Sequence, residues 1–335
     1  MKKERIAVGV ILLFFVGYLV PVSGHAAHGP LVASNGNWWY VGGGGPGNFT
    51  RIQDAIDNAS AGDTVFVYDD AAPYVENIVV DVSISLVGEQ KSSTIINGST
   101  NASGENMTDW FGVWITADNV TVRGFTVQGC NLSGVFLSSN HSTISDTIVS
   151  QNKNNGITIG CLNVSQPYNC RENTLRNCLI EQNLLGLHVS GQNNIITGNV
   201  ISQNDLGITV MFSLNSNISH NQITQDTNGV YLAGSYRTVL YRNNISYNDR
   251  GIYAMMTSAD RILQNNFIGN NESASSAQMF LIQLVSRYKG EISFPIRRNV
   301  WNENYWDKPR SHPYKSPGVL WFFIDWHPAQ EPYDI

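Results

Sequence analysis

The chain has 335 residues, with 20 basic and 26 acidic side chains and a formal net charge of −6. This balance argues against a nucleic-acid-binding protein, because phosphate recognition needs a basic surface. Extensive disorder is excluded as well, since only 14% of the residues are charged and 10% are aromatic. A chain of this length forms one large domain or two ordinary ones.

Residues 1–24 have the pattern of an export signal. Lys2, Lys3 and Arg5 precede an uncharged apolar run from Ile6 to Val20, and small residues follow. This order is typical of a cleaved signal peptide. The alternative is a retained membrane anchor, although the run is shorter than the about 20 apolar residues that span a bilayer. In either case we expect the rest of the chain to be secreted or held at the cell surface.

Residues 25–63 are predicted to form a linker and an N-terminal cap. Apolar residues at helical spacing indicate one short helix that covers the first coil of the domain that follows. These residues are Phe49, Ile52, Ala55, Ile56 and Ala59. Asn48 or Thr50 is expected to cap the start of this helix.

Residues 64–295 contain an internal repeat. Six glycines precede an apolar, variable, apolar triplet at spacings of 22, 30, 21, 22 and 22 residues, namely Gly134, Gly156, Gly186, Gly207, Gly229 and Gly251. Such a period indicates a solenoid, whereas a propeller blade needs about twice this length. Each copy divides into three short alternating stretches separated by turn residues. The fold class predicted is therefore all-β, a single-stranded right-handed parallel β-helix of three-strand coils.

Asparagine is abundant because the repeat requires it. Of the 37 asparagines, many recur at two corner positions of successive coils, among them Asn183, Asn204, Asn248, Asn199, Asn221 and Asn243. Stacked amides at one corner can hydrogen-bond along the solenoid as a ladder. We also expect glycine and asparagine to supply the left-handed backbone angles of the bends.

The same register separates buried from outward positions. Ile201, Ile223 and Ile245 should be superposed in the interior. The outward file of one face is Phe136, Thr158, His188, Thr209, Tyr231 and Tyr253. Tyr231, Tyr253, His188 and Phe136 are candidate ligand-binding residues, because sugars stack on exposed aromatic rings. The alternative is that this aromatic file only stabilises the sheet.

The four cysteines suit an exported chain. Cys161 and Cys170 lie within the one long step of the repeat and could close it as a disulfide. Cys130 and Cys178 occupy repeat positions where a thiol serves as a small buried apolar group. No Cys-x-x-Cys spacing of a zinc or redox site occurs.

Residues 296–335 are rich in tryptophan, tyrosine and proline and are predicted to form a C-terminal cap. Trp301, Trp306 and Trp326 are among its aromatic residues. A stack of parallel strands needs such a cap, because an open edge would pair with another chain. The alternative for this aromatic cluster is a sugar-binding platform.

Together these features resemble NosD-like right-handed β-helix proteins of the pectin-lyase-like superfamily. The resemblance rests on Ala61-Gly62-Asp63-Thr64-Val65, on the Asn-Gly-Ile-x-Ile coils, and on Asn304-Tyr305-Trp306 and Asp325-Trp326-His327-Pro328, which resemble the tails of archaeal exported members. It implies the β-helix fold. It leaves the function open, because proteins with this repeat include carbohydrate enzymes, surface proteins and a copper-related accessory protein.

One corner could support catalysis. Asp205, Asp226, Asp249 and Arg250 gather on three consecutive coils, as in polysaccharide lyases or uronate epimerases, where carboxylates, sometimes with calcium, face a basic residue. The alternative is that Asp226 replaces a ladder asparagine and that Asp249 and Arg250 form a solvated turn. For this arrangement to be catalytic, the carboxylates should lie within about 5 Å of one another with a basic residue opposite.

No metal site is expected from the sequence. Copper, which the family name implies, needs converging His, Cys or Met ligands. His141, His188 and His220 fall in three different columns of the repeat. We therefore expect no resident cofactor. We also expect a monomeric protein that has a binding or structural role toward a polysaccharide or glycan surface.

Overall fold

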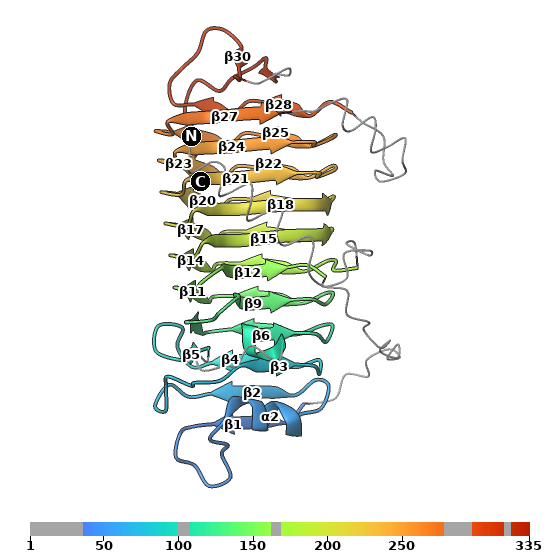
Figure 1. The fold of residues 1–335 in the computed structure, drawn as a ribbon, viewed down its shortest axis with the longest axis vertical. Coiled ribbons are helices and arrows are strands. Elements are labelled where there is room, and N and C mark those ends of the chain that lie inside the picture. The colour runs from blue at the N-terminus through green and yellow to red at the C-terminus, as the bar shows by residue number, and fades with distance from the viewer. Residues whose placement is uncertain (1–35, 99–106, 162–168, 278–296, 318–322) are drawn as a thin grey trace.

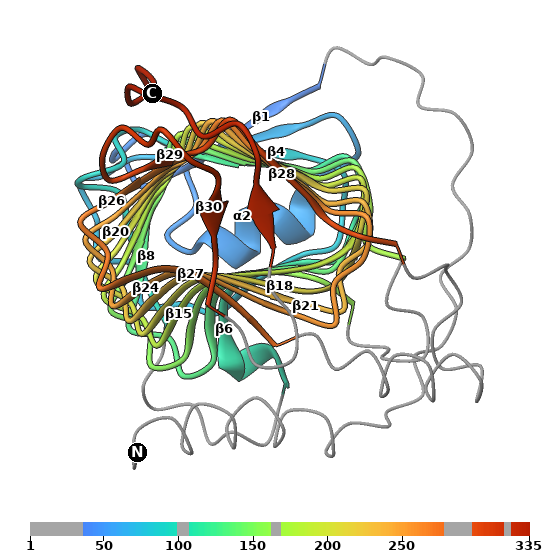
Figure 2. The ribbon, with the colours of Figure 1, turned by 90° about the horizontal axis from the view of Figure 1, so that it is seen from above.

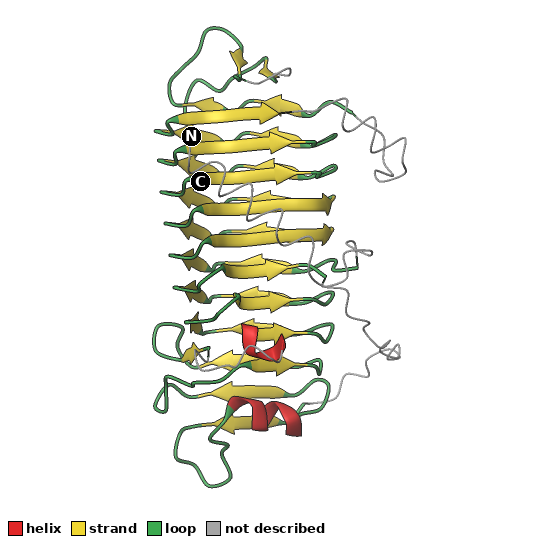
Figure 3. Cartoon of the chain, viewed as in Figure 1, coloured by secondary structure: helices red, strands yellow, loops and turns green. Residues whose placement is uncertain are grey.

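The computed structural model describes residues 36–98, 107–161, 169–277, 297–317 and 323–335. Over these residues the chain forms a column of stacked coils with very little helix (Figures 1 and 3). The predicted export signal at residues 1–24 lies outside the described residues. Within the described ranges, no helix is both long and apolar enough to cross a membrane.

Each regular coil contributes one short strand to each of three parallel sheets, here called sheets A, B and C. Sheet A has 13 strands, and sheets B and C have nine each. In Figure 2, seen from the C-terminal end, the chain passes from A to B to C counterclockwise while it rises toward the viewer. The winding is therefore right-handed, and the predicted fold class is confirmed.

The strands follow the sheets in a fixed order. Sheet A contains β1 (Trp38–Val41), β2 (Thr64–Val67), β4 (Ser85–Gly88), β7 (Thr121–Arg123), β10 (Thr143–Ser145), β13 (Thr174–Arg176), β16 (Ile195–Thr197), β19 (Asn217–Ser219), β22 (Val239–Tyr241), β25 (Arg261–Leu263), β28 (Val300–Asn302), β31 (Ile324–Asp325) and β30 (Tyr314–Lys315). Sheet B contains β5 (Ile95–Asn97), β8 (Thr126–Gln128), β11 (Ile148–Ser150), β14 (Leu179–Glu181), β17 (Val200–Ser202), β20 (Gln222–Thr224), β23 (Asn244–Ser246), β26 (Asn266–Ile268) and β29 (Tyr305–Trp306). Sheet C contains β3 (Ile78–Val80), β6 (Phe111–Ile115), β9 (Ser133–Leu137), β12 (Asn155–Ile159), β15 (Leu185–Gln192), β18 (Leu206–Leu214), β21 (Asn228–Ala233), β24 (Arg250–Met255) and β27 (Glu272–Ala277). The helical elements are α2 (Ile52–Asn58) and the 3-10 turn η1 (Met107–Trp110).

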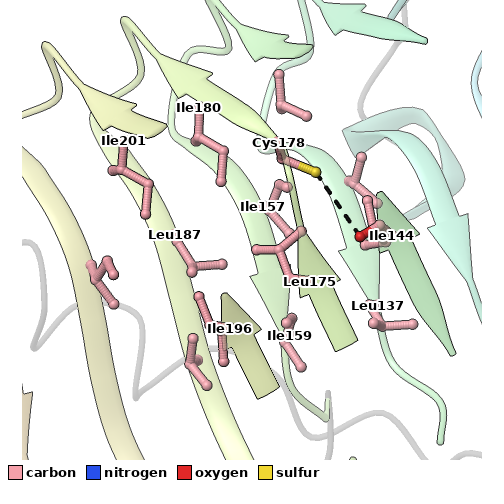
Figure 4. Packing of buried hydrophobic residues seen from close by; sticks show 14 of the residues in the cluster. Leu137, Ile144, Ile157, Ile159, Leu175, Cys178, Ile180, Leu187, Ile196 and Ile201 are labelled. Carbon is pink, nitrogen blue, oxygen red and sulfur yellow. Dashed lines mark hydrogen bonds between the residues drawn. The ribbon is translucent and has the colours of Figure 1, made fainter. Parts of the chain in front are cut away.

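Equivalent residues of successive coils lie directly above one another. In sheet B, Ile180 pairs with Ile201, Ile201 with Ile223, Ile223 with Ile245 and Ile245 with Phe267, and all five side chains are fully buried. Because strands in a sheet are about 4.8 Å apart, these side chains form continuous files through the interior. Figure 4 shows such files converging from the three sheets.

Asparagine and glycine supply only some of the left-handed bends, for example at Asn193, Asn215 and Gly198. The ladder asparagines and repeat glycines keep negative φ, while Gln182 and Gln203, one residue before a ladder asparagine, have φ of 57° and 58°. The repeat glycines are needed for space instead. A Cβ at Gly186 would lie 2.8 Å from Nδ2 of Asn204 and 2.7 Å from the carbonyl oxygen of Gly207. Close packing of the ladder therefore selects glycine at this column.

Helix α2 covers the N-terminal end of the interior, as Figure 2 shows. Its apolar face buries Ile52, Ala55 and Ile56, as predicted. The parallel stack, however, begins earlier than residue 64 and ends later than residue 295. β1 already pairs with β2, and β28 continues sheet A beyond β25, because the flanking segments adopt the register of the repeat.

The predicted N-cap of α2 was wrong. Arg51 occupies the N-cap position and makes no side-chain capping bond, whereas the carboxylate of Glu76 accepts the backbone N–H groups of Ile52 at 2.9 Å and Gln53 at 3.2 Å. Asn48 instead donates its side-chain amide to the carbonyl oxygen of Gly42. The cap is thus supplied by a residue 23 to 24 positions away, from the next coil.

Glu76→Ala is expected to lower the free energy of unfolding by about 1–2 kcal/mol. The change leaves two helix N–H groups without an acceptor and removes a negative charge from a helix N-terminus. Urea denaturation measures the loss. Glu331→Ala, at an exposed position, is the control, and an equal effect of both changes would contradict a capping role for Glu76.

Aromatic side chains close the C-terminal end of the interior. The ring centroids of Phe267 and Trp306 are 4.4 Å apart, and those of Trp301 and Phe323 are 3.4 Å apart. Trp301 is only 4% exposed and Trp306 is fully buried, so these rings do not form an open platform. Trp326 is an exception, with 63% of its surface exposed.

Carboxylates accept several hydrogen bonds at both caps, and at the C-terminal cap a carboxylate ends a ladder. Oδ2 of Asp325 accepts the backbone N–H of Asn304 at 2.9 Å, its side-chain amide at 3.0 Å and Nε1 of Trp306 at 3.1 Å. Asp63 accepts hydrogen bonds from the backbone of Asn37 and from Nε1 of Trp39. A carboxylate suits a ladder end because it accepts several hydrogen bonds and requires no acceptor of its own.

The structure joins Cys161 and Cys170 by a disulfide. Cys130 and Cys178 are buried free thiols, and Sγ of Cys178 lies against the carbonyl oxygen of Ile144 (Figure 4). Burial raises the pKa of both thiols to about 12. These two cysteines therefore act as apolar core residues rather than as reactive groups.

Candidate functional site

A ladder of polar side chains runs along the corner between sheets B and C. The backbone N–H of each member donates to Oδ1 of the next, at 2.7 to 3.0 Å. The members are Asn152, Asn183, Asn204, Asp226, Asn248 and Asn270. A second ladder, between sheets A and B, is built in the same way from Asn199, Asn221, Asn243, Asn265 and Asn304. The six asparagines predicted for ladders all take part in one of these two.

Asp226 is the one acidic member of the first ladder. Its Oδ1 accepts the backbone and side-chain N–H groups of Asn204, at 2.7 and 3.2 Å. Its Oδ2 is buried and has no partner. In the neighbouring coils, the side-chain amide nitrogen of Asn204 or of Asn248 occupies the same place next to the repeat glycine. Nδ2 of Asn204 donates to the carbonyl oxygen of Ile180, and Nδ2 of Asn248 donates to the carbonyl oxygen of Ile223. Oδ2 of Asp226 therefore occupies the position of a donor.

Protonation of Asp226 would turn its unpartnered Oδ2 into a hydrogen-bond donor. Burial raises the pKa of Asp226 to about 8, although the two hydrogen bonds from Asn204 act in the opposite direction. The carboxyl group is therefore mostly neutral at pH 7, and its hydroxyl can donate as the amide of an asparagine does. Asp226 is accordingly a structural member of the ladder rather than an exposed acid.

Two exposed files flank this part of the ladder over three coils. One file consists of Gln203, Gln225 and Tyr247, and the other of Asp205, Thr227 and Asp249. Together with Asn204 and Asp226 they line a shallow hollow of about 430 Å³. The three acids of the predicted corner therefore line a shallow, open hollow that is bounded by amides, carboxylates and one aromatic ring.

The glutamine file is itself hydrogen-bonded. Nε2 of Gln182 donates to Oε1 of Gln203, and Nε2 of Gln203 donates to Oε1 of Gln225, each at 3.3 Å. Tyr247 takes the next position with the same left-handed backbone, at φ 56°, and 65% of its surface is exposed. Its ring lies against Gly269, where a Cβ would come within 2.7 Å of Cε1 of that ring. The file thus ends in an accessible ring that a glycine accommodates.

The predicted catalytic group is not assembled. Nε of Arg250 donates to Oε2 of Glu272 at 2.7 Å, and its guanidinium lies 5.0 Å over the ring of Tyr253. Arg250 lies on β24 in the same column as Glu272, and it is absent from the lining of the hollow. The expectation of a basic residue facing the acids is wrong, because the side chain after Asp249 belongs to the strand and not to the turn.

The two exposed carboxylates are also far apart. The backbone bonds place Thr227 one coil after Asp205 and one coil before Asp249. Two coils correspond to about 10 Å along the solenoid. Between them the third acid, Asp226, is committed to the ladder. Asp205 and Asp249 occupy equivalent positions two coils apart, so their carboxylates do not have the separation of about 5 Å that catalysis would require.

The predicted aromatic face is in register but is not open. Phe136, His188, Tyr231 and Tyr253 fall in one outward file of sheet C. Phe136 is only 4% exposed and packs on Phe111, with ring centroids 4.7 Å apart. The rings of Tyr231 and Tyr253 stack at 5.6 Å and are half-buried. Burial also lowers the pKa of His188 to about 4. Because Phe136 is buried and both tyrosines are half-buried, the flat and open face expected around the tyrosines is not present.

Sequence reasoning overlooked Gln203, Gln225 and Tyr247. The signal was nonetheless present, because a glutamine precedes the ladder residue in four successive coils. Those residues are Gln151, Gln182, Gln203 and Gln225, and Tyr247 occupies the fifth position. A polar column interrupted by one aromatic residue is the pattern that marks this site.

Comparisons with known proteins agree with this architecture. The family model described as periplasmic copper-binding protein (NosD) matches residues 167–311. Over these residues the chain is similar to the NosD family, and the matched segment is part of the parallel β-helix. No curated protein matches the sequence.

Solved structures share the parallel β-helix fold of this chain at low sequence identity. The complex of XylC with xylose superposes with a TM-score of 0.54 at 14% identity, over 72% of this chain and 68% of that chain. The Dettilon tailspike protein gp208 gives 0.52 at 14% identity, over 76% of this chain and 57% of that chain. The enzymatically active domain of bacteriophage CBA120 tailspike protein 2 gives 0.52 at 12% identity, over 76% and 44%. The chain thus spans about half of the length of these tailspikes.

The description of the matched family raises the question of whether this chain could bind copper. The described residues contain no group of three His, Cys, Asp or Glu side chains that could hold a metal ion. His188 lies in sheet C, whereas His220 lies in a turn against Tyr241. Met211 and Met255 share a column but are two coils apart, about 10 Å. These donors do not converge, so the described residues do not fit a copper site.

Proposed function

We propose that this protein is an exported glycan-binding β-helix that holds a polysaccharide in the hollow at the corner of sheets B and C. The observation that carries the proposal is the combination of Gln203, Gln225, Asp205 and Asp249 with the exposed ring of Tyr247 in one concavity. Amides and carboxylates match the alternating donors and acceptors of sugar hydroxyls. An aromatic ring with an apolar face and a polar tip supplies the stacking surface.

The shape of the hollow suits a polymer better than a small molecule. Its two rims run parallel to the solenoid axis, since each is made of one residue from each of three consecutive coils. A small-molecule site would enclose most of its ligand, whereas this hollow is shallow. An extended chain can contact several coils and remain accessible along its length.

Support for a carbohydrate ligand also comes from proteins of the same fold. The complex of XylC contains xylose, and tailspike protein 2 has an enzymatically active domain of this fold. Cleavage is not part of the proposal, because Arg250 is paired with Glu272 and Asp226 is buried in the ladder. Export is inferred from the basic and apolar start of the chain together with the disulfide between Cys161 and Cys170.

Tyr247→Ala is expected to weaken binding of an oligosaccharide about tenfold, because the stacking surface is lost. Titration calorimetry with N-acetylglucosamine and glucosamine hexasaccharides measures the effect. Trp326→Ala removes an equally exposed ring outside the hollow and should leave the affinity unchanged. Equal affinities of the Tyr247 variant and the native protein would refute the proposed site.

A further inference from the structure

We propose that the ligand of this hollow is a polymer of amino sugars, whose free ammonium groups pair with Asp205 and Asp249. The inference rests on the proposed function and narrows it to one charge class. Two exposed carboxylates line the hollow, and no lysine, arginine or histidine does. A cationic sugar is therefore the ligand that complements this surface.

The surrounding charges strengthen this selection. The arginine closest in sequence, Arg250, is neutralised by Glu272 at 2.7 Å, with side chains 30% and 34% exposed. In the same column as Asp205, Lys153 lies two coils earlier, where Nζ donates to Oδ1 of Asn131. The whole chain has a net charge of −6. A polyuronate would meet only like charge in the hollow, so acidic polymers are selected against.

The two acids also have the spacing of a repeating ligand. Asp205 and Asp249 stand two coils apart, about 10 Å along the axis, and Thr227 separates them. This distance is close to the length of two hexose rings in an extended chain. Every second sugar can therefore present an amino group to a carboxylate, while the ring between them faces Thr227 and the glutamine amides. An ammonium–carboxylate hydrogen bond is about twice as strong as a neutral one.

The test is titration calorimetry at low salt and mildly acidic pH with three hexasaccharides, made of glucosamine, N-acetylglucosamine and galacturonate. The glucosamine oligomer should bind about tenfold more tightly than its N-acetylated counterpart, and the galacturonate oligomer should not bind. Asp205→Asn and Asp249→Asn should each reduce that preference several-fold, because each change lowers the affinity for the glucosamine oligomer more than the affinity for the N-acetylated oligomer. Asp81→Asn, at an exposed position outside the hollow, is the matched control.

The outcomes separate the two proposals. If the N-acetylated oligomer binds as tightly as the amine, or if the galacturonate oligomer binds best, the charge class is wrong while a Tyr247-dependent glycan site stands. If no oligomer binds, or if binding is independent of Tyr247, the proposed function fails and this inference fails with it. Loss of the amine preference in both aspartate variants, with Asp81→Asn unchanged, supports the pairing.

Discussion

Asp226→Asn is expected to stabilise the protein above pH 8, by on the order of 3–5 kcal/mol. In the native chain, Oδ2 of Asp226 stands where neighbouring coils place an amide donor, and it has no partner. An asparagine at this position would donate to Oδ1 of Asn248, as Asn204 and Asn248 donate to the next members of the ladder. It would also remove the cost of ionising a buried carboxyl group.

The raised pKa of Asp226 determines whether the native protein gains or loses stability as the pH rises. The pKa of Asp226 is raised from 3.8 to about 8 in the folded protein. Between these values the unfolded chain releases a proton that the folded chain retains, so stability falls as pH rises and levels off above about pH 8. The rim contributes only Asp205, Asp249 and Tyr247 as titratable neighbours, and none of these is a cation that could stabilise the ionised form.

Urea denaturation from about pH 4 to about pH 9 measures the effect. The difference in unfolding free energy between the Asp226→Asn variant and the native protein should grow across this range. Burial also raises the pKa of Asp260, to about 7, but that group is present in both proteins and its contribution cancels. Parallel stability profiles for the two proteins would show that Asp226 does not titrate as the ladder geometry requires.

Asn221→Ala is expected to lower the free energy of unfolding by about 3–5 kcal/mol. Oδ1 of Asn221 accepts the backbone N–H and the side-chain amide of Asn199, and its Nδ2 donates to the carbonyl oxygen of Ile196 and to Oδ1 of Asn243. Alanine removes all four bonds and leaves buried polar groups without partners. Each such group costs about 1–3 kcal/mol, partly offset by local relaxation.

The control uses the same substitution in the same coil. Asn217 is exposed at the start of β19, so Asn217→Ala should change stability by less than about 0.5 kcal/mol. Denaturant midpoints of the two variants give the comparison directly. If Asn221→Ala were as mild as Asn217→Ala, the ladder would be a consequence of the fold rather than a source of its stability.

The repeat could be predicted from sequence because stacking leaves little freedom. Ile201, Ile223 and Ile245 recur at a constant interval, and parallel pairing converts that interval into superposition. The amide ladder follows from the same register, since a buried asparagine must find partners in the adjoining coils. Sequence reasoning therefore placed whole columns correctly, including the outward file of sheet C.

What escaped prediction was the direction and the exposure of individual side chains. Asp249 and Arg250 are adjacent in sequence, yet one belongs to the turn and the other to β24, so they point to different partners. The cap of α2 comes from Glu76, at a separation that no local rule detects. Likewise, Tyr253 is covered by Arg250 and Tyr247 is not, a difference that depends on neighbours in three dimensions.

The carboxylates of the two caps, Asp63 and Asp325, have a consequence for the length of the molecule. Ladder bonds run from a backbone N–H to a side-chain oxygen in the adjoining coil, so each cap interacts only with the coil next to it. Tandem duplication or loss of one whole repeat unit would leave both termini satisfied. Proteins with more or fewer coils can therefore arise by unequal recombination within the repeat. Each added copy of the Gln/Asp rim would act as a further valency along a polymer, so that avidity could increase without any new chemistry.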